Sequence, residues 1–175
     1  NQYAISSQIV NTSQATVSAW VKISSVPTQN GFITGFYGAG GCDKDLYVGT
    51  DGKLYFYVYD GATKTTSVPV NSVPLNTWVF VLGSADGTSI RSYMNGALVG
   101  SASAGATQTN YTSPNIQVSG AASSVTYCGG YMAEQISNVR IYNRALDTAE
   151  IRSIYLAEAP RHGVAFAGSA DGFPF

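Results

Sequence analysis

Carboxylates are the side chains of this chain that could carry out hydrolysis, but their spacing does not favour it. A retaining glycoside hydrolase needs two carboxyl groups about 5 Å apart. The glutamates, Glu134, Glu150 and Glu158, have no acidic residue two positions away. The single histidine, His162, follows Arg161 and has no serine or cysteine nearby in a nucleophile-like context, so we interpret it as a solvated side chain. The sequence therefore predicts a protein that is not an enzyme.

A strand-like run of aromatic residues is the main candidate for a binding surface. Leu54–Tyr59 places three apolar side chains on one face and three tyrosines, Tyr55, Tyr57 and Tyr59, on the other. With Trp20 or Tyr47 nearby, the tyrosines could stack on sugar rings, because flat aromatic faces match the apolar faces of pyranoses. They could instead form cross-strand aromatic pairs or a surface buried by another subunit. Both interpretations stay open.

Two cysteines and two glycosylation sequons favour an extracellular protein. Cys42 and Cys128 lie far apart and lack a metal-ligand spacing, which leaves a disulfide or two free thiols. We favour the disulfide, which would stabilise the fold by about 4 kcal/mol in the chain-entropy model. The sequons at Asn11 and Asn110 lie in polar stretches that we interpret as exposed loops, although this composition also produces such triplets by chance.

Length indicates one domain, and charge and hydropathy argue against nucleic-acid binding and against a transmembrane segment. The chain has 175 residues, enough for one domain with a substantial core. Its net charge of -1, with 9 basic residues, offers no electrostatic footprint for nucleic acid. No apolar run approaches the length of a transmembrane segment.

Short strands joined by turns are expected along most of the chain. Asp-Gly at residues 51–52 and 86–87, and Asn-Gly at 95–96, predict three successive hairpins. The expected strands are residues 2–7, 16–22, 32–36, 46–49, 54–60, 78–84, 89–94, 97–103, 115–118 and 136–142. In the strand 16–22, alternation places Val17, Ala19 and Val21 on one face and Trp20 on the other. Residues 38–45 are expected to form a glycine-rich loop. The pattern favours an all-β, two-sheet antiparallel sandwich.

The stretch 135–151 combines a strand with a capped helix. The strand alternates, with Ile136, Asn138, Arg140 and Tyr142 on one face and Ser137, Val139 and Ile141 on the other. Asp147 is expected to be the helix N-cap, and Glu150 completes the capping box. The buried stripe of the helix is expected to be Ile151, Ile154 and Tyr155.

Four segments resemble landmarks of the laminin-G-like, concanavalin A-like lectin and glucanase jelly rolls. The run 136–151, with its Asn-Arg-Ala-Leu turn, resembles the closing strand and acidic helix start of that family. Residues 16–22, 76–81 and 93–100 resemble three earlier strands and hairpins, in family order. The resemblance implies a jelly-roll domain over residues 1–158 and a tail over 159–175. It implies no single function, because the scaffold hosts lectins, hydrolases, adhesins and structural modules.

The resemblance also raises the question of calcium. Jelly rolls of this type often hold one ion with aspartate side chains and loop carbonyl groups. Asp43, Asp45 and Asp60 are the candidates here. Where family members often have an acidic residue in the closing strand, this sequence has Ser137. Calcium is therefore the one cofactor that the sequence suggests.

The tail lies beyond the family resemblance and looks like an additional strand. Members usually begin with an apolar strand that this chain lacks, and the tail resembles that missing piece. Val164, Ala165, Phe166 and Ala167 are its strand-like residues. We expect them to pair with a terminal strand, either in their own sheet or in a neighbouring copy. Pairing with a neighbour would not close by itself and would generate a filament or a ring.

Two functional hypotheses follow. In the first, the protein is a structural or adhesive subunit of a cell-surface assembly, built from copies of itself by strand pairing; low charge and abundant Tyr and Gly fit a surface that is buried between copies. In the second, it is a glycan-binding, lectin-like module of a secreted protein. The two hypotheses are compatible.

Overall fold

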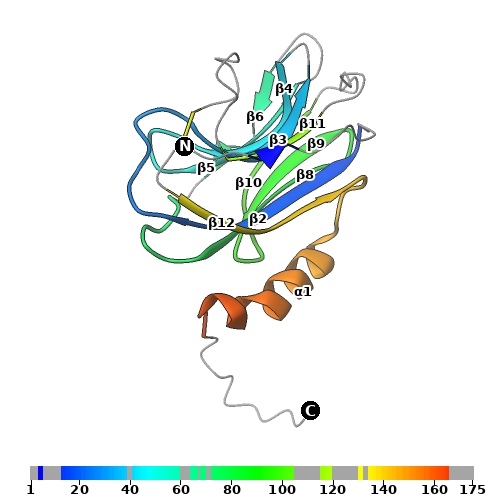
Figure 1. Cartoon of the computed structure of the whole chain (residues 1–175). Helices are drawn as coiled ribbons and strands as arrows, with labels where there is room; N and C mark the ends of the chain where they lie inside the picture. The colour runs from blue at the N-terminus through cyan, green and yellow to red at the C-terminus, as the bar shows by residue number, and fades with distance from the viewer. Residues whose placement is uncertain are drawn as a thin grey trace.

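Two antiparallel sheets face each other, and one helix covers the outer side of the second sheet (Figure 1). The computed structural model describes residues 4–5, 13–38, 41–59, 64–66, 68–69, 72–104, 115–119, 130–131 and 134–165. Sheet A has the strand order β1-β11-β3-β4-β5-β6, and sheet B the order β12-β2-β8-β9-β10-β7. This arrangement confirms the predicted jelly-roll sandwich.

The strands agree with most of the expected ranges. Sheet A consists of β1 (Ala4–Ile5), β11 (Asn115–Val118), β3 (Gly31–Gly38), β4 (Gly41–Val48), β5 (Leu54–Tyr59) and β6 (Lys64–Thr66). Sheet B consists of β12 (Glu134–Tyr142), β2 (Ala15–Ile23), β8 (Val79–Ala85), β9 (Ser89–Met94), β10 (Ala97–Ser103) and β7 (Val68–Pro69). The helix α1 (Thr148–Glu158) and the 3-10 turn η1 (Ala159–His162) follow β12. The short edge strands β6 and β7 have no counterpart in the sequence-based expectation.

The core lies between the two sheets. In β2, Val17 and Ala19 face this core, whereas Trp20 faces the outer side of sheet B, as the alternation predicts. The two sheets are in close contact where Gly83 of β8 meets Phe56 of β5. A Cβ on Gly83 would lie 2.1 Å from the Phe56 ring, so only glycine leaves room for that ring.

The stretch expected to be a glycine-rich loop is largely a strand. β4 begins at Gly41 and pairs with β3 on one side and β5 on the other. Its pairing with β3 is irregular at two places, between Phe32 and Thr34 and between Thr34 and Phe36. Lys44, which lies at the second irregularity, has a φ of 55° in the left-handed region. The loop prediction was wrong for residues 41–45, because pairing with β3, joined by β5 from Asp45 onward, outweighs the low strand propensity of glycine and aspartate.

An irregularity in the pairing of β12 corrects its predicted alternation. The pairing of β12 with β2 is irregular around Asn138, whose φ is 49°, a region that asparagine tolerates better than most residues. The extra residue brings Ile136 onto the same side as Val139 and Ile141, and all three contact the core. Strict alternation would have placed Ile136 on the opposite face from the other two.

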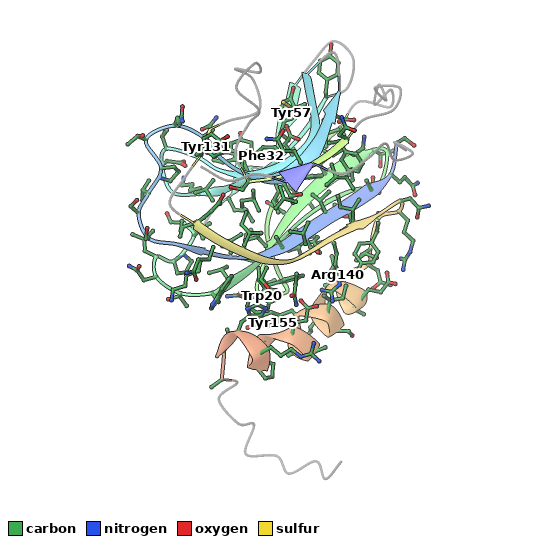
Figure 2. All side chains as sticks on the ribbon, in the orientation of Figure 1. Trp20, Phe32, Tyr57, Tyr131, Arg140 and Tyr155 are labelled. Atoms are coloured by element: carbon green, nitrogen blue, oxygen red, sulfur yellow. The ribbon has the colours of Figure 1, made fainter. Side chains whose placement is uncertain are left out.

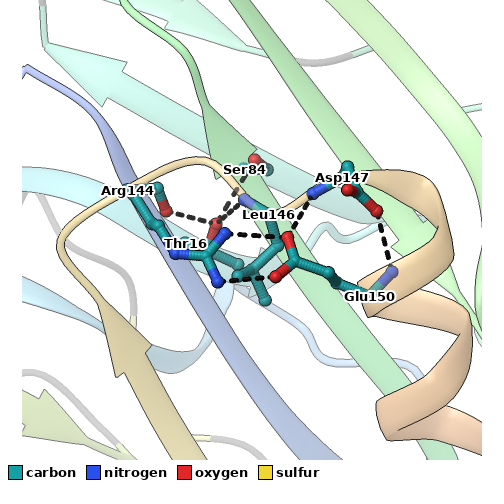
Figure 3. Close-up of polar contacts among 6 residues, drawn as sticks. All are labelled: Thr16, Ser84, Arg144, Leu146, Asp147 and Glu150. Atoms are coloured by element: carbon teal, nitrogen blue, oxygen red, sulfur yellow. Dashed lines mark hydrogen bonds and ion pairs between the residues drawn. The ribbon is translucent and has the colours of Figure 1, made fainter.

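The turn before α1 is anchored to β2, as Figure 3 shows. The Thr16 hydroxyl group donates a 2.9 Å hydrogen bond to Arg144 O and accepts one of 3.0 Å from Leu146 N–H. Asp147 Oδ1 accepts from Glu150 N–H at 2.8 Å, and Glu150 Oε2 accepts from Asp147 N–H at 3.0 Å. These two bonds confirm the predicted capping box.

No helix in the described ranges is long and apolar enough to cross a membrane.

Candidate functional site

Four tyrosines lie on the side of sheet A that points away from the core. In β5, Tyr55, Tyr57 and Tyr59 are partly exposed and alternate with buried apolar residues, as predicted. Tyr47 of β4 is the cross-strand neighbour of Tyr55; the ring centroids are 5.2 Å apart and the ring planes differ by 10°. We call these four residues the tyrosine face. Figure 2 shows Tyr57 on the sheet that lies away from α1.

The hairpin between β4 and β5 holds the Tyr55 ring in place. Its hydroxyl group donates a 3.0 Å hydrogen bond to Asp51 Oδ2. The ring lies against Gly49, where a Cβ would be 2.7 Å from its edge. Asp51 Oδ1 accepts a further hydrogen bond of 3.1 Å from Lys53 N–H. Because these contacts position the ring in the free protein, a ligand that stacks on it has less side-chain entropy to remove.

The phenol groups of the stacked pair stay protonated at neutral pH. Burial, and then the neighbouring Tyr55, raises the pKa of Tyr47 to about 12. Burial and the hydrogen bond to Asp51 raise the pKa of Tyr55. A neutral phenol can both donate and accept a hydrogen bond, and its ring presents an apolar face. This combination suits a ligand with hydroxyl groups around an apolar patch.

Beside the tyrosine face, β4 carries three charged residues that are almost fully covered. Asp43 and Lys44 are 0% exposed and Asp45 is 3% exposed. Lys44 Nζ lies 2.6 Å from Asp43 Oδ2 and 5.7 Å from the centre of the Phe36 ring. Asp43 Oδ1 accepts a 3.2 Å hydrogen bond from Tyr59 N–H. Burial, and then the charge of Asp43, raises the pKa of Asp45 well above its usual value, which favours the neutral carboxyl group.

The candidate calcium ligands do not assemble within the described residues. Asp43 is paired with Lys44, whose Nζ lies 2.6 Å from Asp43 Oδ2, and Asp45 is 3% exposed. Asp60 lies outside the described residues. Across the described ranges, no group of three or more His, Cys, Asp or Glu side chains could hold a metal ion.

Trp20 does not belong to the tyrosine face, contrary to the expectation from the sequence. It lies on β2 of sheet B, is 0% exposed, and points toward α1 (Figure 2). Its ring is 5.9 Å from that of Tyr155, with the planes 23° apart. The alternation in β2 showed which face Trp20 occupies, but the helix that covers this face comes from the other end of the chain.

His162 also differs from the expectation of a solvated side chain. Its ring stacks on Trp20 with centroids 4.2 Å apart and planes at 16°, and it contacts Trp78 at 4.9 Å. Burial lowers the pKa of His162, and the nearby Glu158 partly opposes that shift. The histidine therefore helps to attach η1 to sheet B.

The first residues of the tail pack, together with α1 and η1, against the outer side of sheet B. Val164 N–H donates a 3.0 Å hydrogen bond to Ala159 O, and the Val164 side chain packs against the cluster around Trp20. Neither Val164 nor Ala165 lies in a strand. Phe166 and Ala167 lie outside the described residues. Strand pairing by the tail stays a prediction.

Other expected sites fall largely outside the described ranges. Cys42 is 5% exposed. Cys128 and the sequon residues Asn11 and Asn110 lie outside the described residues. The Cys42–Cys128 bridge and the use of the sequons therefore stay predictions.

A carboxyl group to which the sequence pattern assigns no role joins the two sheets. Glu134, the first residue of β12, accepts a 2.6 Å hydrogen bond at Oε1 from the hydroxyl group of Ser119, which follows β11. Burial raises the pKa of Glu134 to about 7, although the bond from Ser119 acts in the opposite direction. No local signal could have shown this site, because the burial depends on the approach of two strands from different sheets.

Comparisons with known proteins agree with the fold. A family model described as the concanavalin A-like lectin/glucanases superfamily matches residues 1–152. No curated protein matches this chain. Among solved structures, domain 4 of an extracellular arabinanase from Geobacillus stearothermophilus, in complex with arabinotriose, is 18% identical with a TM-score of 0.66, and the match covers 85% of this chain and 69% of that one.

In two further solved structures, the match covers less than half of the other chain. The binding domain of botulinum neurotoxin DC, in complex with SialylT, is 14% identical with a TM-score of 0.66, and the match covers 89% of this chain and 39% of that one. Trypanosoma rangeli sialidase is 22% identical with a TM-score of 0.62, and the match covers 83% of this chain but only 23% of the sialidase. These likenesses concern the fold. Through the family match over residues 1–152, the chain belongs to the concanavalin A-like lectin/glucanase superfamily.

Proposed function

We propose that this domain is a carbohydrate-binding module that holds a saccharide on the tyrosine face. The main support is the stacked, partly exposed pair of Tyr47 and Tyr55, whose ring centroids are 5.2 Å apart. Tyr57 and Tyr59 extend the aromatic surface along the same strand. Aromatic rings with neutral phenol groups match the alternating apolar and hydroxyl surfaces of a sugar. The arabinanase domain and the neurotoxin binding domain, similar in fold, are described in complex with arabinotriose and SialylT.

The proposed module binds without hydrolysing. Asp43 is paired with Lys44, and Asp45 is 3% exposed. These carboxyl groups are therefore poor candidates for the accessible acid and nucleophile that retaining hydrolysis requires. An extracellular setting is part of the same proposal, and it agrees with the cysteine and sequon pattern and with the arabinanase being described as extracellular.

The filament or adhesion hypothesis has less structural support than the carbohydrate-binding one. It requires the tail to be available for a neighbouring copy, whereas Val164 packs against its own domain. The described residues thus favour a tail that begins by packing on its own sheet B over a strand donated to a neighbouring copy.

The test is calorimetric titration with arabinotriose and with a panel of neutral and sialylated oligosaccharides. Tyr55→Ala and Tyr57→Ala are each expected to weaken the binding of the best ligand about tenfold. Tyr142→Ala, a change of a partly buried tyrosine in sheet B, is the matched control and should leave the affinity unchanged. If the control and the two tyrosine-face variants behave alike, the proposed binding face is wrong. Polymers in sedimentation experiments, without glycan binding, would favour the assembly hypothesis.

A further inference from the structure

Two buried polar side chains beside the tyrosine face have atoms that make no hydrogen bond. Gln117 of β11 is 1% exposed, and neither its Nε2 nor its Oε1 has a partner in the described structure. Asp45 of β4 is 3% exposed, and its Oδ1 likewise has no partner there. A buried polar atom without a partner costs about 1–3 kcal/mol, so native proteins contain few of them. Three such atoms on two neighbouring side chains indicate a missing binding group.

The two side chains approach the same space from opposite sides of β3. Gln117 is the cross-strand partner of Gly35, so both project to one face of sheet A. A Cβ on Gly35 would lie 2.2 Å from Asp45 Oδ1, which places the Asp45 carboxyl group over the glycine. Asp45 is in turn the cross-strand partner of Tyr57, so this space adjoins the tyrosine face.

The hydrogen-bonding capacity at this position selects the kind of group that would fit. The Asp45 carboxyl group accepts one hydrogen bond from the backbone of Phe36, and its burial favours the neutral form. A neutral carboxyl group and an amide together supply both donors and acceptors. A metal ion would find too few oxygen ligands, and an anion would face the carboxyl oxygens. A hydroxyl group, which is neutral and both donates and accepts, matches the pair.

We propose that Asp45 and Gln117 form a binding site for one neutral hydroxyl group above Gly35. A water molecule or a saccharide on the tyrosine face can supply that hydroxyl group. If the saccharide supplies it, the inference rests on the proposed function and makes both residues determinants of specificity. The site is covered, so a saccharide reaches it only when a covering side chain moves; Tyr57 is the partly exposed neighbour of Asp45.

The first experiment needs no variant. A high-resolution crystal structure of the free protein should show one solvent oxygen within hydrogen-bonding distance of both Asp45 Oδ1 and the Gln117 amide. Crystals soaked in arabinotriose should show either the same oxygen or a sugar hydroxyl group in its place. A direct hydrogen bond between Asp45 and Gln117, with no oxygen between them in either crystal, would overturn the proposal.

The second experiment identifies the source of the hydroxyl group. Gln117→Met removes the amide group at nearly constant shape, and Gln135→Met, at an exposed position of β12, is its matched control. If a sugar hydroxyl group occupies the site, Gln117→Met weakens arabinotriose binding about tenfold and the control does not. If the occupant is water, both variants keep the wild-type affinity and the oxygen is missing from the Gln117→Met crystal.

The two proposals fail in different ways. A protein that binds no saccharide, or whose binding is insensitive to Tyr55→Ala, contradicts the proposed function, while the crystal of the free protein still decides whether the site holds an oxygen. Conversely, binding that depends on Tyr55 with an empty space above Gly35 supports the tyrosine face and contradicts the hydroxyl site. If Gln117→Met does not fold, Asp45→Leu, which has a similar branched shape and no hydrogen-bonding group, takes its place in the affinity measurement.

Discussion

The indole Nε1 of Trp20 donates a 2.8 Å hydrogen bond to Glu158 Oε2, which ties the end of α1 to β2 of sheet B. The other carboxyl oxygen of Glu158 is paired with the guanidinium group of Arg140 on β12. Glu158 is 4% exposed, so these two partners replace the water that its carboxyl group loses on burial. The arrangement joins β2, β12 and α1 at a single carboxylate.

Removing Arg140 should therefore destabilise the domain. Arg140→Ala leaves the Glu158 carboxylate buried, with the Trp20 indole still donating its hydrogen bond. Breaking a fully buried pair costs about 3–5 kcal/mol, and we expect about 2 kcal/mol here because the Arg140 side chain is 39% exposed. Urea denaturation measures the change in unfolding free energy. Arg152→Ala, at an exposed position of α1, is the control; equal effects of the two variants would contradict the proposed role of the ion pair.

Glu134 should make stability depend on pH near neutrality. Its pKa is raised from 4.5 to about 7 in the folded protein, so ionisation opposes folding. The contribution of Glu134 to the free energy of unfolding is fully present below its unfolded-state pKa, and it is lost as the pH rises through about 7. Glu134→Gln cannot ionise, and relative to wild type it should gain at most about 3 kcal/mol above that range. Denaturation midpoints over a pH series test this expectation.

Glu150→Gln is the control for that pH series, because the pKa of Glu150 is shifted in the opposite direction from that of Glu134. Arg144 lowers the pKa of Glu150, whose contribution is therefore present above its unfolded-state pKa and lost as the pH falls. The variant should be less stable than wild type at neutral pH and approach it in acid. A Glu134→Gln curve parallel to that of wild type would show that Glu134 titrates normally.

Gly83→Ala should overpack the contact between the sheets. The added Cβ would lie 2.1 Å from the Phe56 ring, and we expect a loss of about 1–3 kcal/mol. Phe56→Leu removes part of the ring, so the double variant should be more stable than the sum of the two single changes predicts. A double-mutant cycle from denaturation data measures this coupling. Additive effects would mean that the two residues do not restrict each other.

Reduction should lower the stability if Cys42 and Cys128 are joined, as we predict from the sequence. The expected loss is about 4 kcal/mol, because the bridge would close a long loop in the unfolded chain. Thermal unfolding with and without a reductant measures it, and mass spectrometry of non-reduced peptides identifies the pair directly. Cys42→Ser should not respond to the reductant. Two free thiols in native protein would overturn both the bridge and part of the argument for an extracellular setting.

The sequence by itself determined the features that depend on short-range periodicity. The two faces of β2 and β5 follow from the alternation of residues along a strand, and the structure confirms both. The capping box of Asp147 and Glu150 follows from a spacing of three residues, and it is present. The tyrosine face was predictable for the same reason, since Tyr55, Tyr57 and Tyr59 alternate with the core residues of their own strand.

Tertiary structure alone decided what covers each face and where the strands slip. The sequence suggests Trp20 as part of the binding surface, because nothing near it in the sequence shows that Glu158, 138 residues away, brings a helix over it. The irregular pairing at Lys44 and Asn138, and the raised pKa of Glu134, likewise depend on neighbouring strands. Local patterns specify which way a side chain points, whereas burial, electrostatics and the composition of a site depend on the segments that come to lie against it.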